Sequence, residues 1–170
     1  MCLFTGECQK AKEYHEKALV IVMENGDREV EAASNGDLGN VFQSLGEYQK
    51  ATNYHEKALA IALEFGDRRQ EGERYYQLGN VYLQLRKYRE AKELVDKSLG
   101  ICKTIGYRRG EASASEGLAI VFASISDKQK AKVYFEKTLG IFKEGGYKAE
   151  EAKCTYALDV CLRGMVNLTR

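Results

Sequence analysis

The sequence repeats itself with a period of 40 residues, and this period constrains the fold more than any other feature of the chain. Glycine, leucine and alanine each recur at fixed steps along the sequence. The recurring positions are Gly26, Gly66, Gly106 and Gly146; Leu19, Leu59, Leu99 and Leu139; Ala11, Ala51, Ala91 and Ala131; and Leu38, Leu78, Leu118 and Leu158. So many identities in one register exclude chance, and the chain is therefore an array of repeats.

Each repeat is predicted to contain two helices. Leu38, Phe42 and Leu45 recur at helical spacing, and a second helical pattern follows the break at Gly46. An aspartate just after the glycine that ends a helix, as at Asp67, suits the N-cap of the next helix. Helices are expected near residues 7–24, 28–45, 47–64, 68–85, 87–104, 108–125, 127–144 and 148–165.

A single helical hairpin cannot bury its own apolar stripe, so neighbouring hairpins must stack. The sequence therefore predicts an all-α solenoid of stacked antiparallel hairpins, with about eight helices. We expect one domain over residues 1–170, with no internal linker. Its parts are a half repeat at 1–26, full repeats at 27–66, 67–106 and 107–146, and a terminal half repeat at 147–170.

One repeat carries the pattern of a known family. Leu78 and Gly79, then Tyr82, Ala91 and Ser98, resemble the tetratricopeptide repeat, in which small residues lie where the second helix crosses the first. The same pattern one repeat earlier is Leu38, Gly39, Phe42, Ala51 and Ala58. The resemblance implies a right-handed α-α superhelix whose first helices line a concave groove, and a non-catalytic scaffold that binds other proteins.

The 40-residue period narrows this resemblance to one class. The tripeptide Leu-Gly-Asn at 38–40 and 78–80 and the turn Gly-Asp-Arg at 26–28 and 66–68 are similar to the Partner-of-Inscuteable class of G-protein signalling modulators. Kinesin light chains are more distant relatives by repeat length. The resemblance implies a signalling or spindle-orientation adaptor.

Composition argues against several other classes of function. The 26 basic residues nearly balance the 25 acidic ones, and a net charge of +1 disfavours binding to nucleic acid or to anionic lipid. No apolar run is long enough to span a membrane, and the start of the chain lacks the regions of a signal peptide, so we expect a cytoplasmic protein without membrane insertion. The five cysteines are expected to be reduced core residues.

Catalytic and metal-binding patterns are not apparent in the sequence. No nucleophile stands next to a base, and no glycine-rich phosphate loop joins a strand to a helix. His15 and His55 are 40 residues apart, at a position where the family packs a bulky side chain, so we interpret both as core residues. We expect no enzyme activity, no cofactor and no metal.

The candidate peptide-binding residues lie opposite the buried stripe of the first helix in each repeat. Asparagine suits such a groove, because its amide both donates to and accepts from the backbone of an extended peptide. Simple solvation of these amides, or a bridge between repeats, is the alternative. The candidates are Asn40, Gln43, Glu73, Tyr76, Asn80, Gln84, Lys153 and Tyr156.

A basic residue begins the first helix of each repeat, where it opposes the helix dipole. These residues are Arg28, Arg68, Arg108 and Lys148, and each has a glutamate three residues later. We favour internal ion pairs with these glutamates over a basic rim that would bind acidic residues of a partner.

Two functions remain open from the sequence. The first is recognition of an extended protein or peptide segment in the concave groove. The second is self-association, because the end helices are expected to expose apolar faces that pair with other copies of the chain.

Overall fold

The computed structural model describes the backbone of residues 2–166 and the side chains of residues 10–163. This part of the chain forms eight helices and no strand, which confirms the predicted fold class. The first helix was expected to begin near residue 7 but begins at Cys2, because its helical backbone continues through Gly6. The other described helices begin within two residues of their expected starts. The helices are α1 Cys2–Asn25, α2 Arg28–Ser44, α3 Tyr48–Phe65, α4 Arg68–Gln84, α5 Tyr88–Thr104, α6 Arg108–Ser124, α7 Lys128–Glu144 and α8 Lys148–Val166.

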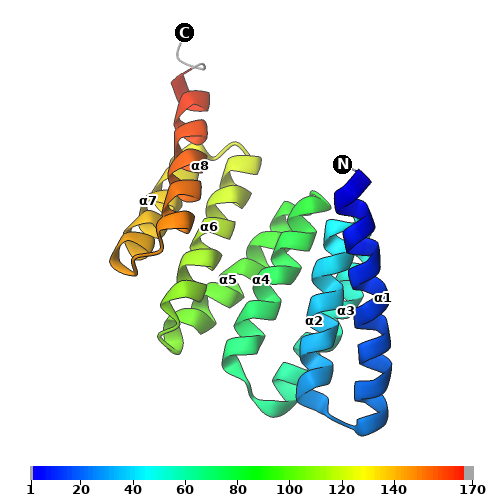
Figure 1. The fold of residues 1–170 in the computed structure, drawn as a ribbon. Coiled ribbons are helices and arrows are strands. Elements are labelled where there is room, and N and C mark those ends of the chain that lie inside the picture. Colours follow the sequence, from blue (N-terminus) through cyan, green and yellow to red (C-terminus); the bar gives the residue numbers. More distant parts are fainter. Residues whose placement is uncertain (1, 167–170) are drawn as a thin grey trace.

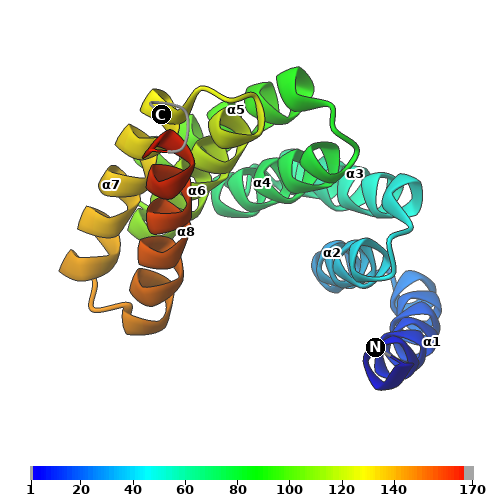
Figure 2. The same cartoon turned by 90° about the horizontal axis from the view of Figure 1, so that it is seen from above.

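Consecutive helices pack against each other and form a right-handed superhelix of stacked antiparallel hairpins (Figure 1). Seen from above, α2, α4, α6 and α8 line the inside of an arc, and α3, α5 and α7 lie on its outside (Figure 2). Contacts also join α2 to α4 and α4 to α6, so the helices on the inside stack on one another. We call α2, α4, α6 and α8 the inner helices and the other four the outer helices.

The turns follow the predicted chemistry. Gly26, Gly66, Gly106 and Gly146 all adopt the left-handed conformation, with φ between 66° and 71°. Asp27 and Asp67 are N-caps, accepting hydrogen bonds from the backbone nitrogens of Val30 and Gln70 at 3.2 and 3.0 Å. Both aspartates therefore stabilise the start of an inner helix, as expected.

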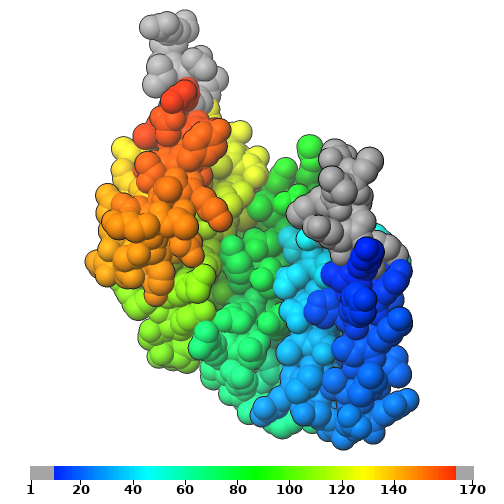
Figure 3. Space-filling view, in the orientation of Figure 1, coloured from blue at the N-terminus to red at the C-terminus, as the bar shows by residue number. Residues whose placement is uncertain are grey.

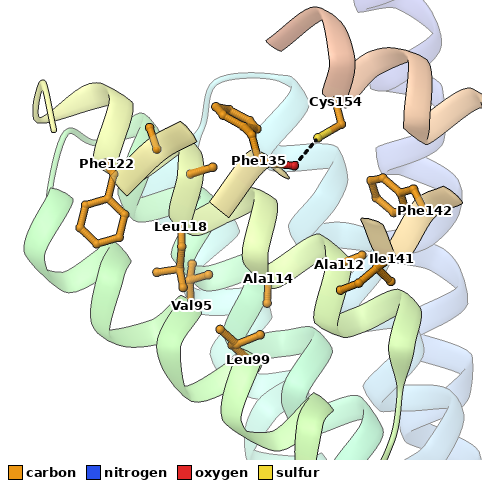
Figure 4. Close-up of a cluster of buried hydrophobic side chains, with 12 residues drawn as sticks. Val95, Leu99, Ala112, Ala114, Leu118, Phe122, Phe135, Ile141, Phe142 and Cys154 are labelled. Carbon is orange, nitrogen blue, oxygen red and sulfur yellow. Dashed lines mark hydrogen bonds between the residues drawn. The ribbon is translucent and has the colours of Figure 1, made fainter. Parts of the chain in front are cut away.

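The core forms where the two helices of a hairpin approach closely at a small residue. A Cβ atom added to Gly39 would lie 2.5 Å from His55, and one added to Gly79 would lie 2.4 Å from Val95. Toward the C-terminal end, the core joins residues of four successive helices, and Figure 4 shows Val95 beside Leu118. The Cys154 thiol lies 3.6 Å from the carbonyl oxygen of Phe135, which ties α8 to α7.

The basic residues that begin the inner helices are paired internally, as predicted. The Arg28, Arg68 and Arg108 guanidinium groups lie 2.8, 2.5 and 2.8 Å from the glutamates three residues later, and Lys148 lies 3.2 Å from Glu151. Arg28 and Arg108 also bind Glu64 and Glu144 at the ends of α3 and α7. These arginines therefore join the two ends of a hairpin.

His55 is fully buried, which agrees with its predicted place in the core. Neither of its ring nitrogens has a hydrogen-bond partner among the described residues. Burial, together with the nearby charge of Arg74, lowers the pKa of His55 to about 4. The equivalent residues of the next repeats are Val95 and Phe135, so an apolar side chain satisfies this position.

We predict that His55 makes the folded protein sensitive to mild acid. Its pKa is lower in the folded chain than in the unfolded chain, so the unfolded state binds the proton first and stability falls as the pH falls. Between about pH 6.5 and about pH 4.5 this loss should be on the order of 2 kcal/mol. Chemical denaturation of wild type and His55→Val across this range measures it.

The valine variant repeats the native pairing of Gly79 with Val95, so it should fold and should lose less stability in acid than wild type does. His15→Val is the matched control, because His15 occupies the same repeat position but is only partly buried. Equal acid sensitivity of wild type and His55→Val would contradict the prediction.

Two non-glycine residues of the described turns adopt the left-handed conformation. Arg86 and Ser126, with φ of 58° and 65°, occupy the turn position that Gly46 holds one repeat before Arg86 and two repeats before Ser126. This conformation costs a residue with a side chain roughly 1 kcal/mol. Arg86→Gly should therefore raise the free energy of unfolding by roughly 0.5–1 kcal/mol, measured by denaturation. Arg86→Ala keeps the Cβ atom and should bring no such gain.

Candidate functional site

The candidate residues all lie on inner helices, but they differ in how far they are available to a ligand. Asn40, at the end of α2, is exposed, and Gln43 on the same helix is partly buried. Gln84 on α4 is exposed too, although it occupies the repeat position of Ser44 and not that of Gln43. On a helix this single step is a turn of about 100°, so the two glutamines lie on different faces.

Tyr76 packs between two inner helices. Its ring lies against α6, 3.2 Å from where a Cβ atom on Gly117 would be. Burial raises the pKa of Tyr76, and a hydrogen bond with the side chain of Asn80 partly offsets that rise. Both residues are partly buried, and the packing of Tyr76 against Gly117 helps to hold α4 against α6.

Glu73 is occupied by other groups of the chain. Its carboxylate accepts a hydrogen bond from the Tyr107 hydroxyl at 3.2 Å and lies 3.5 Å from Arg69 Nε. Arg69 also stacks on the Tyr107 ring, with its guanidinium carbon 4.5 Å from the ring centroid. These three residues, from α4 and the start of α6, form a cluster that partly fills the space between the two helices.

The candidates on α8 are open to solvent. The side chain of Lys153 is exposed and Tyr156 is 71% exposed. Across from them, Glu116 of α6 is partly buried, and burial raises the pKa of its carboxyl while Lys153 lowers it. This end of the inner surface therefore offers an aromatic ring and a charge of each sign.

Arg74 was missed by the sequence analysis. The arginine side chain is only 13% exposed, and its Nη1 lies 2.0 Å from where a Cβ atom on Gly36 would be. It donates to the Gln70 side chain at 3.1 Å and lies 4.0 Å from Glu73. Burial lowers its pKa.

A signal for this pair was present in the repeat register. The other residues at the repeat position of Arg74 are small, namely Ser34, Ala114 and Cys154. The other residues at the position of Gly36 are large, namely Tyr76, Glu116 and Tyr156. Arg74 is large at a repeat position that is otherwise small, and Gly36 is a glycine at a position that is otherwise large. This pattern indicates that the Arg74 side chain takes up the space that a side chain at position 36 would need.

Figure 3 shows the inner helices forming one face of the molecule, with α8 at one side and α1 and α2 at the other. Its amides, tyrosines and charges can hydrogen-bond to the backbone of an extended segment. In the part of the chain that the structure describes, no three His, Cys, Asp or Glu residues are grouped as metal ligands. No described helix combines the length and the apolar character needed to cross a membrane.

Comparison with known families gives one match. A family model described as tetratricopeptide repeat matches residues 1–64 and 73–144. Among curated proteins, no sequence matches this chain significantly.

Several solved structures share the fold. A Rap protein complexed with competence and sporulation factor has a TM-score of 0.85 and 15% identity, over 96% of this chain and 46% of that one. The apo form of RapI has a TM-score of 0.81 and 20% identity, over 95% and 45%. A putative kinesin light chain repeat protein from Podosopora anserina has a TM-score of 0.67 and 16% identity, over 94% and 89%. This chain thus spans less than half the length of the two Rap proteins.

Proposed function

Because this chain belongs to the tetratricopeptide repeat family, we propose that it is a non-catalytic scaffold that binds an extended segment of another protein across its inner helices. The observation that carries this proposal is the stacking of α2, α4 and α6 along the inside of the arc. Exposed polar and aromatic side chains, including Asn40, Lys153 and Tyr156, lie on the inner helices. The Rap protein of the same fold, complexed with competence and sporulation factor, supports a binding role.

The sequence supports further details of this function, namely the extent of the array, the cellular location and the class of adaptor. We propose that residues 1–170 act as one array and that the protein works in the cytoplasm. The 40-residue period and the Leu-Gly-Asn tripeptides support a signalling adaptor similar to the Partner-of-Inscuteable class. The eight candidate residues are proposed as contacts, with Asn40, Lys153 and Tyr156 as the most accessible, and Glu73 and Tyr76 as residues that also hold the inner helices together.

We predict that Asn40→Ala weakens ligand binding without lowering stability. Asn40 is exposed, so the variant removes hydrogen bonds to a ligand and leaves no buried group unpaired. The loss of one or two such bonds should weaken affinity roughly two- to tenfold. Peptides selected on wild type from a random display library provide the ligands, and titration calorimetry gives their affinities.

Asn53→Ala is the matched control, because Asn53 is an exposed asparagine on the outer helix α3. Binding should be unchanged in this variant, and the melting temperature should be unchanged in both. Failure of the library to yield any binder, or equal affinities for wild type and Asn40→Ala, would count against the inner surface as the binding site.

Self-association is a second candidate function, and it rests on a specific observation at α1. Ile21 is 57% exposed, whereas Ile61, Ile101 and Ile141, at the same position of the next repeats, are 3%, 7% and 5% exposed. Tyr14 is 71% exposed, whereas its equivalent Tyr54 stacks on Phe42 at 5.2 Å. An apolar face that is buried elsewhere in the array is therefore open on α1.

If copies of the chain pair through this face, Ile21→Gln should shift the equilibrium toward the monomer. Sedimentation velocity across a wide range of chain concentrations measures the shift. Met23→Gln is the control, because Met23 is 60% exposed but lies about 200° around the helix from Ile21. A monomer at every concentration of the wild type would remove this candidate.

A further inference from the structure

A crevice separates the starts of successive inner helices, and in the later repeats a tyrosine of the chain partly fills it. Tyr107 lies between α4 and α6, stacked against Arg69 and hydrogen-bonded to Glu73. One repeat later, Tyr147 lies under Arg109 at 5.9 Å and contacts Phe142 edge-on at 6.1 Å. Each crevice thus holds an aromatic ring with an arginine over it.

The crevice between α2 and α4 lacks both of these side chains. Asp67 stands at the position of Tyr107, and Glu29 stands at the position of Arg69. A cavity of about 400 Å³ remains open there, against about 170 Å³ in the next crevice. Its apolar lining includes Ala32, Ala33, Ile61 and Phe65, with Glu29 and Asp67 at its polar edge.

The two carboxylates at this edge differ from most acids near the helix starts. Glu31, Glu71, Glu111 and Glu151 each bind a cation. Glu29 and Asp67 make no ion pair among the described residues, although Asp67 accepts the backbone hydrogen bond of Gln70. The edge of the cavity therefore carries negative charge that the chain itself does not neutralise.

We propose that this cavity binds an arginine side chain of the partner segment. This inference rests on the proposed function, because the cavity lies beside two of the inner helices that would hold the segment. An arginine of the segment would be the anchoring residue, and the cavity between α2 and α4 would be the place where the segment is anchored.

The lining suits each part of an arginine. The alanines and Ile61 can cover its aliphatic stem. The ring of Phe65, which is 54% exposed, offers a face on which a guanidinium stacks, as Arg69 does on Tyr107. The carboxylates of Glu29 and Asp67 then lie at the edge where the charge would end.

A tyrosine fits this cavity less well, although it partly fills the two later crevices. Tyr107 has the acceptor Glu73 and the stacked Arg69, but their equivalents here are Ala33 and Glu29. An incoming tyrosine would therefore lack the equivalents of the Glu73 acceptor and the stacked Arg69 that hold Tyr107.

Nuclear magnetic resonance with single-residue probes tests the proposal. N-acetyl-arginine amide should shift the backbone amide signals of Ala33 and Gln70 in a saturable way, and the shifts should weaken in high salt. N-acetyl-citrulline amide, which has the same shape without the charge, should bind about tenfold more weakly. N-acetyl-tyrosine amide should not bind more tightly than the arginine probe.

Variants of the chain assign the probe to the cavity. Glu29→Gln should weaken arginine binding roughly two- to fivefold, whereas Glu24→Gln, at another exposed glutamate without an ion pair among the described residues, should not. Asp67→Tyr restores the side chain of the later repeats and should abolish binding. Asp67→Asn keeps an N-cap side chain, and it replaces Asp67→Tyr in the binding test if the tyrosine variant does not fold.

Two results would overturn the proposal: equal binding of the arginine and citrulline probes, or shifts that persist in Asp67→Tyr. The single-residue probe does not need the rest of the inner surface, so this test can succeed or fail independently of the peptide titrations. Peptides whose affinity depends on Asn40 but not on any arginine would leave the proposed function in place and remove this cavity from it.

Discussion

The close crossing of the two helices in each hairpin is the contact on which the rest of the structure depends. At Gly39 and Gly79 there is no room for even one additional carbon atom beside His55 and Val95. Because the helices meet there, the neighbouring residues Leu38 and Leu78 are buried. Every hairpin buries apolar surface through its neighbours, so one small residue per repeat sets how the whole array stacks.

The parts of the fold that depend on local spacing could be predicted from the sequence. Helical periodicity placed the elements, and the glycine and aspartate of each turn act at positions 26–27 and 66–67 as expected. The pairing of Arg28 with Glu31 was also predictable, since residues three apart on a helix are neighbours whatever the tertiary structure. Repetition strengthened these inferences, because the glycine of the turn and the ion pair three residues apart recur in each repeat.

The chemistry of the candidate site could be predicted only in part. A helical register indicates which face a residue occupies, but it does not show what lies across from that face. Glu73 is on an inner helix, as expected, yet Tyr107 on the next inner helix already occupies its carboxylate. Tyr76 packs against Gly117, and Arg74 lies over Gly36, through contacts between repeats that no single repeat contains. Whether a side chain of an inner helix is free to bind a ligand therefore depends on the residues of the neighbouring repeat.

This dependence on pairs explains why departures from the repeat are informative. Where a large residue replaces a small one, as at Arg74, the array remains packed because the opposite residue becomes smaller at the same time. Where Asp67 replaces the tyrosine of the later repeats, Gln70 and Phe65 are larger than their equivalents Gly110 and Ile105, but they do not fill the space and the larger cavity remains. A fully compensated substitution preserves the packing, whereas a partly compensated one leaves an open cavity. The space between α2 and α4 therefore differs from the space between α4 and α6 in its larger open cavity, which is where we place the proposed arginine.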